Sequence, residues 1–342
     1  MTDQWIRQIS VILYNVKNVP TTTSPQEGNP IIYNQPDPNS PALVLSDFKI
    51  TFNVRAADQE TPDHCAIRIY NLSKETVKRI TGGFSSTTNT HTVGEFTDIS
   101  LNAGYQGNFG SIFKGTIKQF RVGREDNLNS YVDIFAADGD YLYSKTISMN
   151  IPAAKTYEEV IQAISEQVET DIDTTSVQIS STNLVFLRGA VIFGMARAKY
   201  RLLANNLNAS WRIENGKIIF MDNQGYREGE VICINAKTGL IGVPEQTDQG
   251  IKVTCLLNHK IRIGDRVQLN NQEITQLSES NPNNPPIMYN RLVGPIYFNP
   301  PTDADGYYRV FVVEHEGDTR GQNWYTHLIC LAMTTDKKKT LG

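Results

Sequence analysis

The side chains of this 342-residue chain that could do chemistry are few and scattered. Its five histidines stand singly, with no close pair at the spacing of metal ligands, and they are His64, His91, His259, His315 and His327. His315 and His327 would approach each other if their strands paired across the turn between Glu316 and Asn323. For that pair we favour a place on a strand surface over a metal or catalytic site.

A calcium loop is the next candidate, because Asp303-Ala304-Asp305-Gly306 resembles part of an EF-type loop. With Gly306 in the sixth position, Pro301 would have to be the first ligand and Val312 the last. Neither side chain carries a carboxylate, so we interpret the segment as a turn.

Two acidic pairs, Glu158-Glu159 and Asp171/Asp173, are neighbours in sequence, whereas glycoside hydrolysis needs carboxylates that face each other across a cleft. The Gly-rich run at 104–110 is followed by no helix, which favours a hairpin tip over a phosphate cradle. Nucleophile-elbow, HExxH, Walker A and dinucleotide motifs are absent from the sequence. We therefore predict no catalytic residue, no cofactor and no metal site.

Composition is that of a soluble globular protein of two or three domains, with 39% hydrophobic residues and 24 glycines. The formal net charge is −4, from 32 basic and 36 acidic residues. This balance does not favour nucleic acid as a tightly held partner, and a local basic patch stays open as an alternative.

Four cysteines, Cys65, Cys233, Cys255 and Cys330, show no CxxC spacing, and three of them lie in strand-like runs. This usage suits a reducing cytoplasm, and a disulfide stays open as an alternative. The sequence shows no signal-peptide pattern at residues 1–10 and no run of eighteen apolar residues. We expect no membrane segment, and release by lysis rather than by secretion.

The first block, 1–150, is predicted to be a β-barrel domain, because apolar and polar residues alternate along several short runs such as 48–54 and 66–70. Ser73 is expected to cap a short helix near 73–80, which Gly82-Gly83 would end. A Pro-rich loop is expected near 20–41.

The second block, 151–225, is predicted to be a small α/β domain. Thr156 and Glu159 have the spacing of a capping box. The stripe that follows has helical periodicity and consists of Tyr157, Val160, Ile161, Ile164 and Val168. A second helix is expected over 193–208, and a hairpin with a type I′ turn at Asn215-Gly216.

The third block, 226–342, is predicted to be a second β-barrel domain with a Pro-rich loop near 277–303. Strands at 251–257 and 261–269 are expected to form a hairpin around Asn258-His259, with Gly264 at a bulge or corner. The two Pro-rich segments hold 12 of the 15 prolines and are either surface loops or arms that reach a neighbouring subunit. The interface candidates are Tyr33, Tyr289, Trp324 and Tyr325, although an ordinary core position is the favoured alternative for Trp324 and Tyr325.

Two runs in the third block resemble the baseplate hub proteins of long-tailed bacteriophages. They are GLIGVPEQTDQGIKVTCLLNHKIRIGDRVQL at 239–269 and VEHEGDTRGQNWYTHLICL at 313–331. Weaker similarity covers 99–119 and 195–220, where a helix is followed by a hairpin, and the Pro-rich segments have no counterpart.

The resemblance implies a structural homotrimer in the virion tail, assembled in the host cytoplasm, with two tube-type β-barrels per chain flanking the α/β domain. Three such chains would form a pseudo-sixfold ring that connects a hexameric tail tube or distal tube ring to a trimeric spike. Other baseplate proteins would be neighbours, and the tape-measure protein and DNA would only pass through the channel. No enzymatic activity is implied.

Two alternatives come from other functional classes. A tail-associated cell-wall hydrolase could use the α/β block, but the sequence shows no paired acids or metal ligands for it. A glycan- or receptor-binding β-module is suggested by the long loops and by an aromatic content of 9%.

Overall fold

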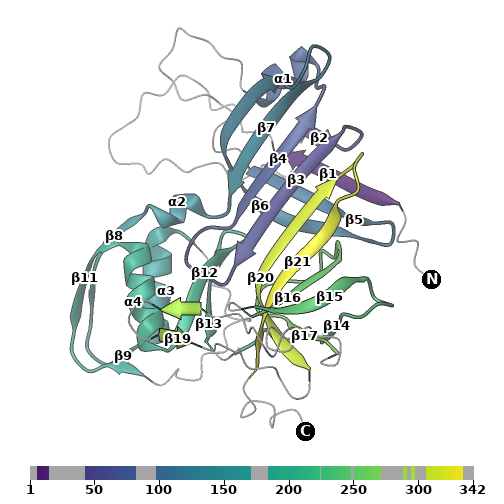
Figure 1. The fold of residues 1–342 in the computed structure, drawn as a ribbon. Helices are drawn as coiled ribbons and strands as arrows, with labels where there is room; N and C mark the ends of the chain where they lie inside the picture. The colour runs from purple at the N-terminus through teal and green to yellow at the C-terminus, as the bar shows by residue number, and fades with distance from the viewer. Residues whose placement is uncertain are drawn as a thin grey trace, which may run out of the picture. The chain divides into compact units, whose positions relative to one another are not determined.

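The fold is mainly β with a helical insert, as predicted (Figure 1). The computed structural model describes residues 6–14, 43–81, 98–170, 184–223, 225–247, 250–270, 288–290, 294–296 and 306–333. Two compact units divide the chain: unit 1 is Met1–Val54, Asp63–Asp140 and Glu316–Asn323, and unit 2 is Arg55–Pro62, Tyr141–His315 and Trp324–Gly342. The three predicted domains, 1–150, 151–225 and 226–342, stay a prediction.

Unit 1 contains an antiparallel sheet in which the strands follow the order β3-β4-β7-β6-β5-β1-β2. Their bounds are Arg7–Leu13 (β1), Leu43–Leu45 (β2), Ile50–Ala57 (β3), His64–Tyr70 (β4), Asp98–Tyr105 (β5), Asn108–Arg124 (β6) and Ser130–Ala137 (β7). Alternate residues of these strands are buried, as in β3, where Ile50, Phe52 and Val54 point inward. The period-two prediction is therefore confirmed here.

The predicted short helix is also present. Helix α1 spans Lys74–Ile80, and the Ser73 Oγ accepts a hydrogen bond from the Thr76 backbone N–H at 3.1 Å. This contact satisfies one of the N–H groups that the first turn leaves without a partner. The predicted stop at Gly82-Gly83 and the Pro-rich loop near 20–41 lie outside the described residues.

The tip of the C-terminal hairpin, Glu316–Asn323, belongs to unit 1. The Arg7 guanidinium on β1 holds it by donating to three backbone carbonyls, those of Asp318 (3.1 Å), Gly321 (2.7 Å) and Gln322 (2.8 Å). The Thr319 hydroxyl also accepts from the Ile50 N–H at 3.0 Å. The tip of the hairpin is thus bound to strand β1.

In unit 2, helices α3 and α4 cover one face of the sheet formed by β8 and β11 (Figure 1). The insert consists of α2 (Asp140–Tyr143), β8 (Thr146–Ile151), β9 (Lys155–Thr156), α3 (Tyr157–Val168), β10 (Val185–Phe186), β11 (Ala190–Met195), α4 (Ala196–Asn206), β12 (Ala209–Glu214) and β13 (Lys217–Asp222). Strand β8 pairs with β11, β9 with β10, and β12 with β13, all antiparallel.

Helix α3 confirms both sequence signals. The Thr156 Oγ1 accepts from the Glu159 N–H, and the Glu159 carboxylate accepts from the Thr156 N–H at 2.8 Å. The stripe is buried at Val160, Ile161, Ile164 and Val168, which join one apolar core with residues of α4, β12 and β13. The Asn215-Gly216 turn has φ of 53° and 75°, as a type I′ turn requires.

The predicted helix over 193–208 is wrong at its start, because α4 begins at Ala196. Phe193 lies in β11 opposite Ser148 of β8, and the pairing continues to Met195. A non-local strand pair therefore overrides the helical pattern at these residues.

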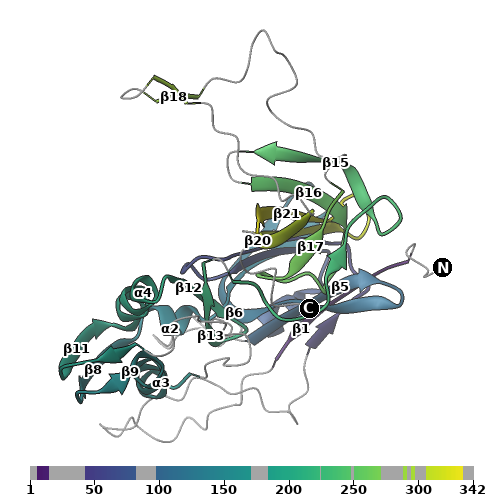
Figure 2. The same cartoon turned by 90° about the horizontal axis from the view of Figure 1, so that it is seen from below.

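A second β-block completes unit 2, with a separate apolar core. Figure 2 shows β15, β16, β21 and β20 side by side, in the order that the sheet pairing gives. Its strands are β14 (Ile232–Cys233), β15 (Leu240–Thr247), β16 (Gly250–Leu256), β17 (Arg266–Gln268), β18 (Met288–Asn290), β19 (Gly294–Ile296), β20 (Tyr307–Asp318) and β21 (Trp324–Ala332). Strands β18 and β19 fall in the predicted Pro-rich loop and pair with each other.

The predicted hairpin of 251–257 with 261–269 is wrong. Strand β16 pairs with β15 on one side and with β21 on the other, so no edge is left for a third partner. The second run supplies only β17, which pairs with β14 and β20. Ile261 and Ile263 are buried all the same, and Gly264 turns the chain with φ of 85°, as expected.

All four cysteines are free, and Cys65, Cys255 and Cys330 are buried as small apolar residues. Among the described residues, no helix has the length and apolarity needed to cross a bilayer.

The β5–β6 hairpin generates a test with a matched control. A Cβ added at Gly104 would lie 2.1 Å from the Asn108 carbonyl oxygen, whereas one at Gly107 would meet nothing within 4 Å. Gly107→Ala should therefore cost only the strain of its φ of 84°, about 1–2 kcal/mol, and Gly104→Ala should cost clearly more. Urea unfolding of both variants checks this, and an equal loss would contradict the steric argument.

Candidate functional site

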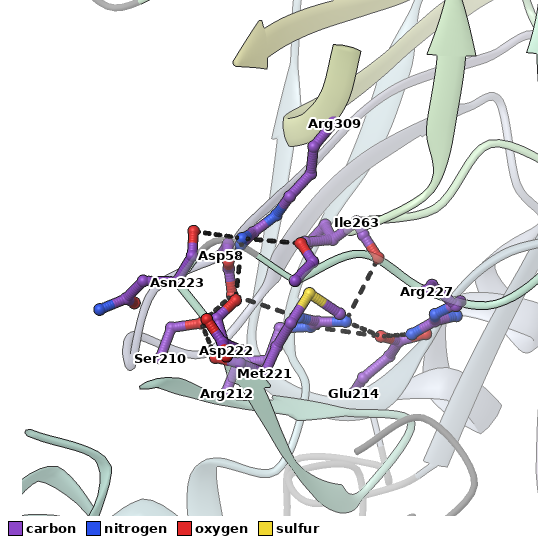
Figure 3. A network of polar contacts seen from close by, with 11 residues as sticks. Asp58, Ser210, Arg212, Glu214, Met221, Asp222, Asn223, Arg227, Ile263 and Arg309 are labelled. Carbon is purple, nitrogen blue, oxygen red and sulfur yellow. Dashed lines mark hydrogen bonds and ion pairs between the residues drawn. The ribbon is translucent and has the colours of Figure 1, made fainter. Parts of the chain in front are cut away.

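A network of charged side chains lies inside unit 2, and most of them are buried (Figure 3). We name it the Asp58 network, and it consists of Asp58, Ser210, Arg212, Glu214, Arg227 and Arg309. Among the described residues, no group of His, Cys, Asp and Glu could hold a metal ion. We therefore take this network as the candidate site.

Four chain segments position these residues. Asp58 directly follows β3, and its backbone N–H donates to the Phe311 carbonyl at 2.9 Å. Arg212 and Glu214 are two residues apart on β12 and so point to the same side of the strand. Arg227 follows β13, with its N–H on the Gly264 carbonyl at 2.7 Å, and Arg309 comes from β20.

Asp58 is the centre of the network. Its carboxylate forms ion pairs with Arg212 Nη1 at 3.2 Å and with Arg309 Nη2, and it accepts from Ser210 Oγ at 2.8 Å. The side chains of Asp58 and Arg212 are each 1% exposed. Burial of a single unpaired charge would cost several kcal/mol, so each of these groups requires its partners.

Glu214 joins two further cations. It lies 2.9 Å from Arg212 Nη2 and 2.7 Å from Arg227 Nη2. Burial alone would raise the pKa of this carboxyl, but the two guanidinium groups outweigh it and the pKa is lowered. Glu214 is therefore ionised at neutral pH.

Arg309 ties the network to the backbone after β13. Its Nη1 donates to the carbonyls of Asp222 (3.2 Å), Asn223 (2.9 Å) and Gly225 (3.2 Å). Burial lowers the pKa of Arg309 to about 10, which leaves it charged at neutral pH. The two carboxylates bind arginines, and Arg309 also binds backbone carbonyls, so the network holds the chain segments that carry these residues together. The arrangement presents no activated nucleophile.

Sequence reasoning missed these residues, although a signal existed. Arg212 stands between Trp211 and Ile213, and Arg309 stands between Tyr308 and Val310. A charged residue among strongly apolar strand neighbours indicates a buried ion pair. Its partner, Asp58, is 154 residues from Arg212 and cannot be identified from local pattern.

The predicted His315–His327 pair does not form a surface site, because His315 is buried at 4% exposure. Its Nδ1 is 2.9 Å from Thr326 Oγ1, and His327 Nδ1 is 3.0 Å from Thr254 Oγ1. Burial lowers the pKa of His315 to about 3, with smaller effects from His259 and His327. Its expected place on a strand surface is wrong, and the hydroxyl contacts show a packed, neutral imidazole.

The interface candidates are spread over the chain. Trp324 is 0% exposed in β21, and Tyr325 is half-buried with its ring 6.2 Å from that of His327. Tyr289 lies in β18, of which only the backbone is described, and Tyr33 lies outside the described residues. Trp324 thus occupies the core position that was its favoured alternative, and the interface roles of Tyr33, Tyr289 and Tyr325 stay predictions. Asp303 and Asp305, in the segment interpreted as a turn and not as a calcium loop, also lie outside the described residues.

Two solved structures share this fold. The 43 kDa tail protein of prophage MuSo2 from Shewanella oneidensis matches with a TM-score of 0.52 and 4% sequence identity, over 85% of this chain and 94% of that one. A tail protein from Neisseria meningitidis MC58 matches with a TM-score of 0.53 and 8% identity, over 95% of this chain and 96% of that one. At such low identity the likeness concerns the fold.

The family model described as "Baseplate hub gp41" matches residues 35–277, which is more than half of the chain. The chain matches no curated protein sequence.

Asp58→Asn tests the network. The change leaves Arg309 without its counter-charge and Arg212 with Glu214 alone, so we expect a loss of about 3–5 kcal/mol in the free energy of unfolding. Glu60, two residues away, pairs with Arg201 in an ion pair whose side chains are 30% and 53% exposed. Glu60→Gln should therefore cost less than about 1 kcal/mol. Denaturant unfolding measures both, and a similar loss in the two variants would contradict the role given to burial.

His315 generates a prediction on pH. Its folded pKa lies below the unfolded value near 6.5, so the unfolded state binds more protons between about pH 3 and 6.5. Stability from this group is complete above about pH 6.5 and falls on acidification. Between pH 7 and 5 the wild type should lose about 2 kcal/mol more than His315→Gln, which keeps a polar group for Thr326 but does not titrate. Parallel pH curves for the two proteins would refute this.

Proposed function

The chain belongs to the baseplate hub gp41 family, and on that premise we propose that it forms a homotrimeric ring that connects the tail tube to the spike. The family match over residues 35–277 carries the proposal. The fold shared with two tail proteins supports it.

The physical basis is a symmetry mismatch, because a sixfold tube must meet a threefold spike. A chain with two similar β-modules solves it, since three chains then offer six near-equivalent positions. The antiparallel sheet of unit 1 and the β-block of unit 2 support two such modules. We propose that they are the tube-type barrels of 1–150 and 226–342, with the α/β domain of 151–225 between them.

The partners that follow are the tail tube protein or distal ring, the spike and other baseplate proteins, with Tyr33, Tyr289 and Tyr325 as the candidate contacts. The tape-measure protein and DNA pass through the channel as cargo. We place the protein in the virion baseplate, assembled in the host cytoplasm.

We also propose that the role is structural and not enzymatic. Within the described part of the chain, the carboxylates of the Asp58 network are each bound to two arginines. A cell-wall hydrolase would need a carboxylic acid or a metal-bound water open to substrate.

Electron cryo-microscopy of the assembled tail tests the proposal. We expect three copies of the chain in one ring at the tip of the tube, with density that approximates sixfold symmetry on the tube side. A chain that stays monomeric in the particle, or that lies outside the axis, would contradict it. Peptidoglycan release by the purified protein would favour the hydrolase instead.

A further inference from the structure

Strand β11 (Ala190–Met195) presents an exposed apolar face. Val191, Phe193 and Met195 are 78%, 74% and 40% exposed. The residues opposite them on β8 are the uncharged Asn150, Ser148 and Thr146, which are exposed as well. A face with large apolar side chains and no charge is typical of the centre of a protein contact.

Among the described residues, no strand pairs with the outer edge of β11. The Ala196 N–H donates to the Lys145 carbonyl at 2.9 Å, which makes this a hydrogen-bonded pair at the end of the β8–β11 ladder. Hydrogen-bonded pairs alternate with non-hydrogen-bonded pairs in an antiparallel ladder. The N–H and C=O groups of Val191, Phe193 and Met195 therefore point away from β8.

The opposite edge of the same sheet is already covered. The Ser148 carbonyl, which faces away from β11, accepts from Gln167 Nε2 of helix α3 at 3.1 Å. Because Ser148 is opposite Phe193, this contact agrees with a non-hydrogen-bonded pair at these two residues. It also leaves β11 as the edge of this sheet that can accept a further strand.

A donor strand exists in the same chain. Strands β18 (Met288–Asn290) and β19 (Gly294–Ile296) form a sheet of their own and, among the described residues, pair only with each other. A two-stranded hairpin of this length is not stable alone in water. It therefore requires a further strand or surface.

Pro295 determines which outer edge of the β18–β19 hairpin can pair with a further strand. Tyr289 is opposite Pro295, and proline has no N–H, so the two residues form a non-hydrogen-bonded pair. Their backbone groups point outward on either side of the hairpin. Pro295 blocks the outer edge of β19, whereas Tyr289 offers both an N–H and a C=O on the outer edge of β18.

The described residues on either side of the segment that contains the hairpin are bound to each other. The Leu269 N–H donates to the Gly306 carbonyl at 2.9 Å, so the chain leaves the β-block and returns to it at one point. The residues between Leu269 and Met288 can span up to roughly 60 Å. This reach is sufficient for a neighbouring molecule.

We propose that β18 of one copy adds to the open edge of β11 in a neighbouring copy of this chain. The proposal rests on the proposed function in one respect, that the neighbour is the next subunit of the ring. Each copy carries one donor strand and one acceptor edge, so the contact is head-to-tail and can close into a ring. It extends the β8–β11 sheet to four strands, and the side chains of the added strand would lie beside the exposed Val191, Phe193 and Met195.

Disulfide trapping tests the contact in a Cys233→Ser background, because Cys233 is the exposed cysteine and the other three are buried. Tyr289→Cys is combined with Phe193→Cys on β11 or, as control, with Ser148→Cys on β8. In an added strand, position 289 lies about 5 Å from β11 and about 10 Å from β8, beyond the reach of a disulfide. We expect interchain disulfides with Phe193→Cys and none with Ser148→Cys.

Ring formation is measured separately by particle mass. Three results in an assembled ring would overturn the contact between β18 and β11 while the proposed ring stands. The Tyr289→Cys/Phe193→Cys pair could stay reduced, form a disulfide within one chain, or react no better than the Ser148→Cys control. Interchain disulfides in dimers that never close would keep the contact between β18 and β11 and overturn the ring.

Two further variants test the contact without introduced cysteines. Tyr289→Pro removes the outward N–H without removing a hydrogen bond inside the hairpin, and Pro295→Ala alters the other edge. In the assembled ring, hydrogen exchange at the Phe193 amide should be at least tenfold faster with Tyr289→Pro than with Pro295→Ala. Equal protection in the two variants would refute the proposal.

Discussion

The requirement that a buried charge keep its counter-charge governs the structure of unit 2. Asp58 has almost no access to water, so it is tolerated only where Arg212 and Arg309 meet it. That condition places the loop after β3, strand β12 and strand β20 at one point. The insert and the β-block have separate apolar cores, which alone would define their relative position less strictly. The ion pairs add direction, because a guanidinium fork accepts only a narrow range of geometries.

Local signals in the sequence predicted local structure well. The Thr156/Glu159 spacing predicts the start of α3, and Asn215-Gly216 predicts the turn between β12 and β13. Alternation predicts β3. Each of these signals depends on residues a few positions apart. The hairpin expected at 251–269 is wrong for the opposite reason. Whether β16 pairs with the next strand or with β21, some seventy residues on, depends on competition between distant segments, and alternation is the same in both cases.

The candidate site shows the same limit more sharply. Burial of Arg212 and Arg309 could be suspected from their apolar neighbours, but not the identity of Asp58 as their common partner. The resemblance in the third block predicted the family, because it rests on runs of specific residues. The structural relatives, at 4% and 8% identity, retain the fold with other residues, since alternation and turn chemistry can be met by many sequences.

The grip of Arg7 on the hairpin tip has a consequence for synthesis. Arg7 leaves the ribosome 311 residues before its partner Asp318. Unit 1 therefore cannot complete its contacts during translation, and a high contact order of this kind slows folding. Until the C-terminal hairpin emerges, the nascent chain holds an unfinished sheet whose open strands invite misassociation. Newly made protein would thus benefit from chaperone protection until the segment with Asp318 has been synthesised.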